Sequence, residues 1–192
     1  AANKECECSL IVIEGYKPHW PEEFEHIRAA LQRTLGELAL RIDHIGSTSV
    51  PGLGAKDVID VQITVRDFSP DLVQRMLDAG YQYRADIIRD HVPLGDDPNP
   101  SQWEKRYFRE QAGQRRTHIH VRQAGNANQR YALLFRDYLR AHPRSAQSIE
   151  HLKREIAKRH DDIDIYLDIK EPAYDLIWDA AQEWADLVSW QG

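Results

Sequence analysis

The segment that most constrains the fold of this chain is a short hydrophobic run that carries one acidic residue. In Val58-Ile59-Asp60-Val61-Gln62-Ile63, β-branched apolar residues surround Asp60 and Gln62. β-Branched residues favour strands, and residues i and i+2 of a strand point to the same face of a sheet. We therefore predict a strand over residues 59–65, with Asp60 and Gln62 side by side. A carboxylate in such apolar surroundings is costly unless it binds something, so Asp60 is a candidate site residue.

A glycine- and hydroxyl-rich turn precedes this strand. Gly46-Ser47-Thr48-Ser49 follows a predicted strand, and its glycine lets a ligand approach the main chain. Backbone N–H groups and hydroxyls in such a turn can donate to phosphate oxygens. With a strand carboxylate that holds a hard cation such as Mg²⁺, the pattern is typical of phosphoryl and nucleotidyl transfer. A hairpin turn whose neighbouring Asp only hydrogen-bonds a loop explains the same residues equally well.

Two histidines form a second candidate cluster. His118 and His120 lie two apart in a strand predicted over residues 118–121, so they share a face, and Arg116 is expected to point the same way. Imidazoles suit a transition metal or an anionic ligand better than Mg²⁺. The alternative is a pair of partly exposed histidines on the solvated face of an edge strand.

Periodicity predicts an α/β front half and a helical back half. The expected elements are a further strand at residues 10–13, helices that start at Pro21 and Ser69, and helices from about residue 128, with a break at Pro143, a cap at Ser145 and a last helix from Pro172. Residues 93–102 contain three prolines and an acidic pair. This stretch is predicted to be a flexible surface loop and is a candidate lid over a site.

Length and composition limit the organisation of the chain. Its 192 residues fit a single domain over residues 10–192, after a flexible tail at 1–9 that holds Cys6 and Cys8. The net charge of −6 makes nucleic acid an unlikely partner. No apolar run approaches the ~20 residues of a membrane span and no secretory signal is visible, so we expect a cytoplasmic protein without membrane contact. The oligomeric state is left open.

The run from His44 to Gln62 resembles the hallmark of the GrpB family, a branch of the nucleotidyltransferase-like superfamily. Further blocks resemble that family in the same order over roughly residues 10–178: Tyr16 to Phe24, Arg106-Tyr107-Phe108, Arg116 to Val121, Leu133 to Leu139, and Tyr166 with Lys170. The resemblance implies a nucleotidyltransferase-like mixed β-sheet flanked by helices, with a helical C-terminal half. Members of this family sometimes occur fused to dephospho-coenzyme A kinase.

The resemblance also implies roles for individual residues. It implies that the glycine turn binds phosphate, that Asp60 holds a metal ion, and that the histidine strand lies beside Asp60. The superfamily usually has a second acidic residue where this chain has Gln62, which keeps an oxygen ligand but loses the charge. The expected catalytic residues are Asp60 and Gln62, the expected metal ligands are Asp60, Gln62, His118 and His120, and the expected phosphate-binding residues are Gly46, Ser47, Thr48, Lys56, Arg106, Arg116, Arg136 and Lys170.

Three functions are compatible with these residues. The first is metal-dependent transfer of a nucleotidyl group from a nucleoside triphosphate to an unknown small-molecule or protein acceptor, with Mg²⁺, Mn²⁺ or a transition metal as cofactor. The second is an accessory module that binds a nucleotide or another anion without turnover, because Gln62 removes the charge that chemistry needs. The third is a hydrolase that holds its metal with Asp60, His118 and His120.

Overall fold

The computed structural model describes residues 11–192 and contains one five-stranded mixed sheet. Its strands are β1 (Arg41–Ile45), β2 (Ile59–Val65), β3 (Tyr81–Tyr83), β4 (Arg106–Gln111) and β5 (Thr117–Gln123), in the spatial order β1-β2-β5-β4-β3. The central pair, β2 and β5, is parallel, and the other neighbouring pairs are antiparallel. The predicted tail at 1–9, with Cys6 and Cys8, lies outside the described residues.

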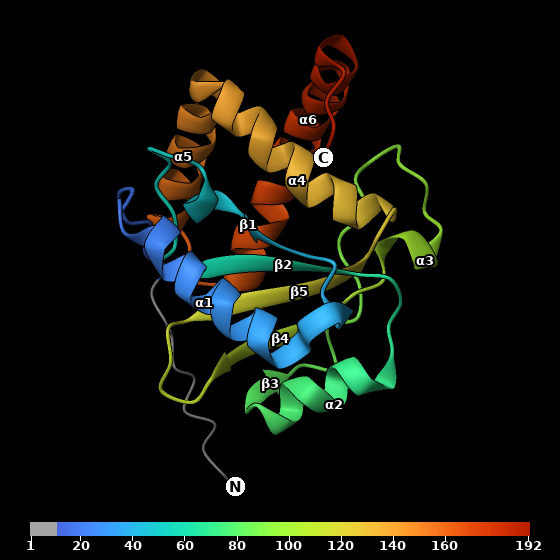
Figure 1. Cartoon of the computed structure of the whole chain (residues 1–192). Helices are drawn as coiled ribbons and strands as arrows, with labels where there is room; N and C mark the ends of the chain where they lie inside the picture. The colour runs from blue at the N-terminus through green and yellow to red at the C-terminus, as the bar shows by residue number, and fades with distance from the viewer. Residues whose placement is uncertain (1–10) are drawn as a thin grey trace, which may run out of the picture.

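Helices cover both faces of this sheet (Figure 1). They are α1 (Trp20–Leu35), α2 (Pro70–Asp78), α3 (Pro100–Trp103), α4 (Ala127–Ala141), α5 (Pro143–Ala157) and α6 (Ile163–Val188), with short 3₁₀ turns at Gly36–Leu38 and Ser47–Ser49. The helices α1 and α2 pack on one side of the sheet, and α4 to α6 lie on the other. The predicted fold class, a mixed sheet flanked by helices with a helical C-terminal half, is confirmed.

The side of the sheet under α1 and α2 is apolar. Ile59, Val61 and Ile63 of β2 alternate toward this side and are fully buried, together with Ile119 and Val121 of β5. Burying a side chain of this size contributes about 1.5–3 kcal/mol to stability. Because strand residues alternate, the intervening positions of β2 and β5 must face α4, and all of them are polar: Asp60, Gln62, Thr64, His118, His120 and Arg122.

The predicted starts of the first two helices are confirmed. Pro21 lies in the first turn of α1, and the Ser69 hydroxyl caps α2 by accepting a hydrogen bond from Leu72 N at 3.3 Å. The prediction of a strand at residues 10–13 is wrong for residues 11–13, the part of it that the structure describes. Residues 11–13 form no strand, and Ile11 and Ile13 instead pack against the helical residues Ile156 and Tyr166.

Two expectations for the helical half need correction. The break at Pro143 is confirmed, but α5 begins at this proline itself, so Ser145 is not its cap. The last helix begins well before Pro172, which lies inside α6. The Asp162 carboxylate caps α6 by accepting hydrogen bonds from Asp164 N and Ile165 N at 2.8 and 3.2 Å. The helix therefore starts at this cap, upstream of the proline at which the sequence pattern predicts its start.

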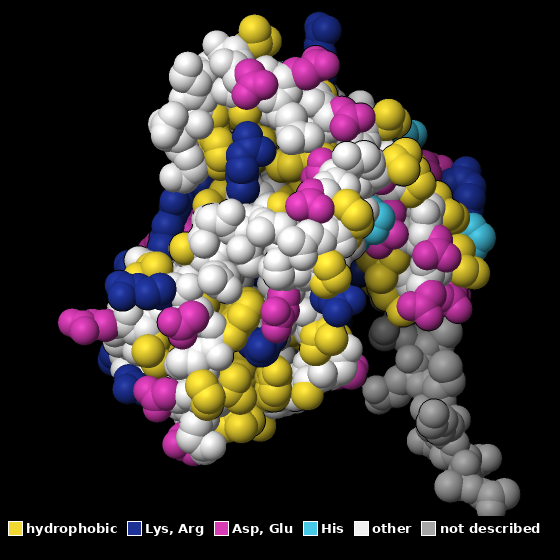
Figure 2. Space-filling view, turned by 90° about the vertical axis from the view of Figure 1, so that its right-hand side faces the viewer, with side chains coloured by type: hydrophobic (Ala, Val, Ile, Leu, Met, Phe, Trp, Pro, Cys, Tyr) yellow, Lys and Arg dark blue, Asp and Glu magenta, His cyan; other side chains and the backbone are white. Residues whose placement is uncertain are grey.

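The loop expected as a flexible lid is fastened to the helices. Trp178 Nε1 donates to Asp96 Oδ2 at 2.9 Å, and Trp103 Nε1 donates to the Asp97 carbonyl at 2.7 Å. On the face shown in Figure 2, basic, acidic and hydrophobic side chains are interspersed and charges of one sign do not dominate. Within residues 11–192, no helix has both the length and the apolar character needed to cross a membrane.

Candidate functional site

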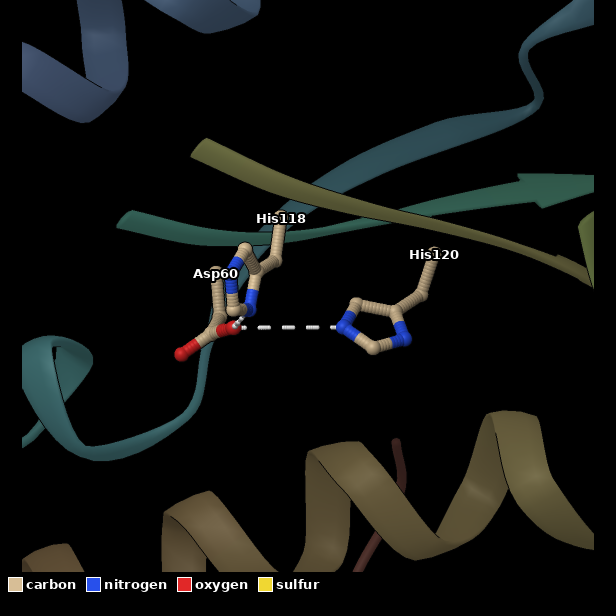
Figure 3. Close-up of side chains that lie close together, drawn as sticks. All are labelled: Asp60, His118 and His120. Atoms are coloured by element: carbon tan, nitrogen blue, oxygen red, sulfur yellow. Dashed lines mark ion pairs between the residues drawn. The ribbon is translucent and has the colours of Figure 1, made fainter. Parts of the chain in front are cut away.

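The parallel pairing of β2 with β5 brings the predicted site strands together. Asp60 pairs with His118 and Gln62 pairs with His120 across the two strands. Figure 3 shows the side chains of Asp60, His118 and His120 projecting from the sheet on the same side. His118 Nδ1 lies 3.3 Å and His120 Nε2 lies 3.8 Å from Asp60 Oδ1. One ligand atom from each residue lies within 4.8 Å of the other two, which is close enough to hold a single cation.

The glycine turn lies directly against this cluster. Gly46 follows β1 with φ of +68° and ψ of −173°, a conformation that is nearly exclusive to glycine. A Cβ at this position would lie 2.5 Å from Asp60 Oδ2, so a side chain is excluded on steric grounds as well. The structure therefore places the main chain of the turn beside the carboxylate, as the sequence led us to expect.

The charges in the cluster are set by its surroundings. Burial raises the pKa of Asp60, but the neighbouring His118 and His120 rings lower it by more, so the net pKa lies well below the usual range. The pKa of His120 is lowered to about 4, mainly by burial and then by the charge of Lys105. Near neutral pH the site therefore holds an ionised carboxylate beside a neutral imidazole.

A lysine that the sequence analysis did not single out lies under the turn. Lys153 of α5 is buried, and its Nζ donates to Ser47 Oγ at 3.0 Å and to the Gly54 carbonyl at 2.7 Å. Burial, followed by the nearby charge of Lys170, lowers its pKa to about 7. Its spacing along α5 is that of an ordinary buried helix residue, so only its residue type indicated that it could have a role at the site.

Two predicted phosphate-binding lysines lie in the same neighbourhood. Burial, followed by the charges of Lys170 and Arg116, lowers the pKa of Lys56 to about 8. The Lys56 ammonium lies 4.6 Å from the centre of the Tyr166 ring, and that of Lys170 lies 4.4 Å from the Tyr174 ring. The charge of Lys170 lowers the pKa of both Lys56 and Lys153, so these lysines of the turn region and α5 share one cationic neighbour from α6.

Three other predicted phosphate-binding residues have partners within the protein. Thr48 is buried and its Oγ1 lies 3.0 Å from His44 Nε2. Arg136 donates to the His44 carbonyl at 3.1 Å and pairs with its neighbour Asp137. Arg106 lies opposite Val121 in the sheet, so its side chain points to the α1–α2 side, where it covers Phe68. The structure does not bring Arg106 to the cluster.

Gln62 does not join the converging ligand atoms. Its side chain is fully buried, Oε1 accepts a hydrogen bond from Arg122 at 2.7 Å, and Nε2 donates to the Gln129 carbonyl of α4 at 3.1 Å. Because both ends of the amide are satisfied by the protein, the expectation that Gln62 binds metal beside Asp60 is not supported by its contacts. Its position ties the sheet to α4.

A buried ionic network lies behind the histidines. Asp90, in the loop after β3, accepts hydrogen bonds from Lys105 Nζ at 2.7 Å, from Arg122 Nε at 2.8 Å and from Asn128 Nδ2 at 3.0 Å. Sequence reasoning missed this network because its members come from four segments and none follows a periodic pattern.

Two cavities described in the structure lie elsewhere: one of about 300 Å³ between α1 and the β4–β5 connection, and one of about 360 Å³ between Glu37 and Leu72. We place the candidate site at Asp60 because ionisable groups converge there.

These features define a mixed α/β protein whose polar sheet face carries an Asp-His-His cluster beside a glycine turn and a group of lysines. The GrpB protein family matches residues 10–179, and the chain belongs to this family. A crystal structure of the conserved protein GrpB from Enterococcus faecalis is similar, with 34% identity, a TM-score of 0.73, and coverage of 90% of this chain and 98% of that one.

Curated relatives extend the similarity to longer proteins. A protein named dephospho-CoA kinase from Mycolicibacterium paratuberculosis is 37% identical over 91% of this chain and 46% of its own length. The UPF0157 protein YqkA from Bacillus subtilis is 32% identical over 88% of this chain and 46% of its own length. The chain therefore spans about half the length of these two relatives.

Proposed function

We propose that this chain catalyses metal-dependent transfer of a nucleotidyl group from a nucleoside triphosphate to a small-molecule or protein acceptor. The observation that carries the proposal is the contact between the Gly46 turn and Asp60, with Lys153 bonded to Ser47, the next residue of the same turn. One short segment thus lies between a carboxylate suited to a cation and a lysine group suited to phosphates.

Each group has a distinct role in this proposal. Asp60 and His118 would hold a divalent cation such as Mg²⁺ or Mn²⁺, since such ions often take one or two protein ligands and complete their shell with phosphate oxygens. The bound cation would neutralise charge on the reacting phosphates. When the acceptor displaces pyrophosphate from the α-phosphorus, Lys56, Lys153 and Lys170 would stabilise the negative charge of the leaving group.

Two other functions each have an observation in their favour. The engagement of Gln62 with Arg122 and Gln129 leaves Asp60 as a lone carboxylate, which favours a module that binds a nucleotide or another anion without turnover. The convergence of Asp60, His118 and His120 within 4.8 Å favours a metal-dependent hydrolase. Elemental analysis of the purified protein tests the hydrolase, because a transition metal held by three residues should copurify.

Isothermal titration with nucleoside triphosphates in Mg²⁺ or Mn²⁺, combined with an assay for released pyrophosphate, tests the leading proposal. We expect metal-dependent binding that Asp60→Asn abolishes and that the matched variant Asp67→Asn, at an exposed position, leaves intact. Binding without pyrophosphate release across a panel of acceptors would favour the module, and release of inorganic phosphate would favour the hydrolase. Absence of nucleotide binding with either metal would rule out the proposal.

A further inference from the structure

We infer that Lys105 and Arg122 hold His120 in the tautomer that carries its proton on Nε2, so that His120 donates a hydrogen bond into the site instead of serving as a third metal ligand. The identification of the atom that accepts this hydrogen bond as a phosphate oxygen rests on the proposed function. The assignment of the tautomer rests only on the contacts of the ring. Lys105 and Arg122 are positioning residues in this scheme, because they act through His120.

The contacts of His120 Nδ1 carry the inference. This nitrogen lies 3.4 Å from Lys105 Nζ and 3.4 Å from Arg122 Nη2. A guanidinium offers only N–H donors and keeps its charge at any pH at which the protein is folded. The Nδ1 atom that faces it must therefore present its lone pair. In a neutral imidazole the single proton then lies on Nε2, the nitrogen that faces Asp60.

The two cations cannot move away from the ring. Asp90 binds both, accepting from Lys105 at 2.7 Å and from Arg122 at 2.8 and 3.0 Å. Arg122 also donates to Gln62 Oε1 at 2.7 Å. Their side chains are only 8% and 6% exposed, so water does not replace these contacts. The network therefore keeps the positive charges of Lys105 and Arg122 beside His120, and it also connects the sheet to α4.

Metal-binding histidines normally have the opposite surroundings. Their second ring nitrogen usually donates to a carboxylate, a carbonyl or a water, which leaves the first nitrogen free to bind the metal. Coordination through His120 Nε2 would direct an Nδ1–H at two cations instead. The Nε2 atom lies 3.8 Å from Asp60 Oδ1, beyond a good hydrogen bond, so its proton remains available to an oxygen bound between them.

His118 differs from His120 in this respect. Its Nδ1 lies 3.3 Å from Asp60 Oδ1, and its Nε2 is buried with no hydrogen-bond partner. The contacts described for His118 include no cationic donor at either ring nitrogen. Two histidines on one face of one strand thus take different roles: His118 can bind a cation with Asp60, and His120 can donate to the phosphate.

Two-bond ¹H–¹⁵N correlation spectra of the metal-free, labelled protein read the tautomer directly. We expect the Nε2–H form for His120, assigned by its disappearance in His120→Gln and stable between about pH 6 and pH 8. Lys105→Met should leave this tautomer in place, because Arg122 still faces Nδ1. The double variant Lys105→Met/Arg122→Met, examined where it remains folded, removes both cations from Nδ1 and should permit the Nδ1–H form. An Nδ1–H signal for His120 in the unmodified protein would overturn the inference.

Titration with Mn²⁺ alone and with inorganic pyrophosphate alone separates the two histidines. His118→Ala should weaken Mn²⁺ binding by roughly tenfold or more. His120→Ala should leave Mn²⁺ affinity unchanged and weaken pyrophosphate binding, and His151→Ala, at an exposed position on α5, should change neither. Equal loss of Mn²⁺ affinity in the His118 and His120 variants would contradict the inference. If Mn²⁺ does not bind at all, the proposed function fails, whereas the spectra still decide the tautomer.

Discussion

Gly46 approaches Asp60 so closely that any side chain at residue 46 would displace the carboxylate. A Cβ built on Gly46 lies 2.5 Å from Asp60 Oδ2 and 2.9 Å from Asp60 Cβ, well inside van der Waals contact. The bend after β1 and Asp60, the second residue of β2, are therefore matched to each other. Substitution at residue 46 tests this match without changing any charged group.

Gly46→Ala should destabilise the fold and displace Asp60. The backbone conformation alone costs about 1–3 kcal/mol for a residue other than glycine, and the clash with Asp60 adds to this cost. Gly52→Ala is the matched control, because Gly52 also has a positive φ of +81° but nothing within 4 Å of its Cβ position. Urea unfolding should detect both changes, whereas Mn²⁺ affinity should fall only in the Gly46 variant. Equal effects of the two variants on Mn²⁺ affinity would contradict the match.

Gln62→Glu restores the acidic residue that the family resemblance led us to expect, but the structure predicts no gain in metal binding. The new carboxylate would pair with Arg122 and would lose the donor that Gln62 Nε2 supplies to the Gln129 carbonyl. An unsatisfied buried carbonyl costs about 1–3 kcal/mol. We expect lower stability in thermal unfolding and unchanged Mn²⁺ affinity. A rise in Mn²⁺ affinity with the appearance of pyrophosphate release would instead indicate an enzyme whose site has lapsed.

Asp90→Asn should be among the most destabilising conservative substitutions. It removes the only carboxylate that Lys105 and Arg122 share in the described structure, so two buried cations lose their counter-charge. Breaking one side of a buried ionic network costs about 3–5 kcal/mol. Asp86→Asn, at an exposed carboxylate that pairs with Arg84, serves as control and should change the unfolding midpoint little. Similar unfolding midpoints for the two variants would show that the network contributes no more than a surface pair.

Sulfate binding should weaken as the pH rises. The pKa values of Lys153 and Lys56 are lowered to about 7 and about 8, so both lysines lose charge above these values and their attraction for an anion falls. Sulfate keeps its own charge throughout this range, and its binding favours the protonated lysines, which moves the decline to somewhat higher pH. Lys153→Met should lower the affinity at pH 6 and flatten the pH profile. Lys158→Met, at the exposed residue that follows the last residue of α5, should match the unmodified protein.

Local patterns predicted the apolar side of the molecule well. The alternation of Ile59, Val61 and Ile63 specified both the strand and its buried face, and the spacing of Phe24, Leu31 and Leu35 specified the helix that covers it. The pairing of His118 beside Asp60 followed from the family resemblance, because register between strands distant in sequence is not encoded in either strand alone.

The contacts that control the polar side could not be predicted in the same way. Lys153, Asp90 and Arg122 reach the site from three separate segments, and each bonds to a side chain at least 32 positions away in the sequence. Gln62 illustrates the same limit. Its type and strand position suggested a metal ligand, but its role depends on Arg122 and Gln129, whose proximity only the folded chain establishes.

The geometry of the Asp-His-His cluster depends on the hydrophobic packing that aligns the parallel strands β2 and β5. If β5 shifted by one residue relative to β2, Ile119 and Val121 would leave the interior and both imidazoles would enter it. A shifted register would therefore lose the whole buried layer that these residues form. The spacing between carboxylate and imidazoles is thus maintained by residues that never touch a ligand. Substitutions under α1 that loosen this layer should disturb the spacing between the carboxylate and the imidazoles on the opposite side of the sheet while the protein is still folded.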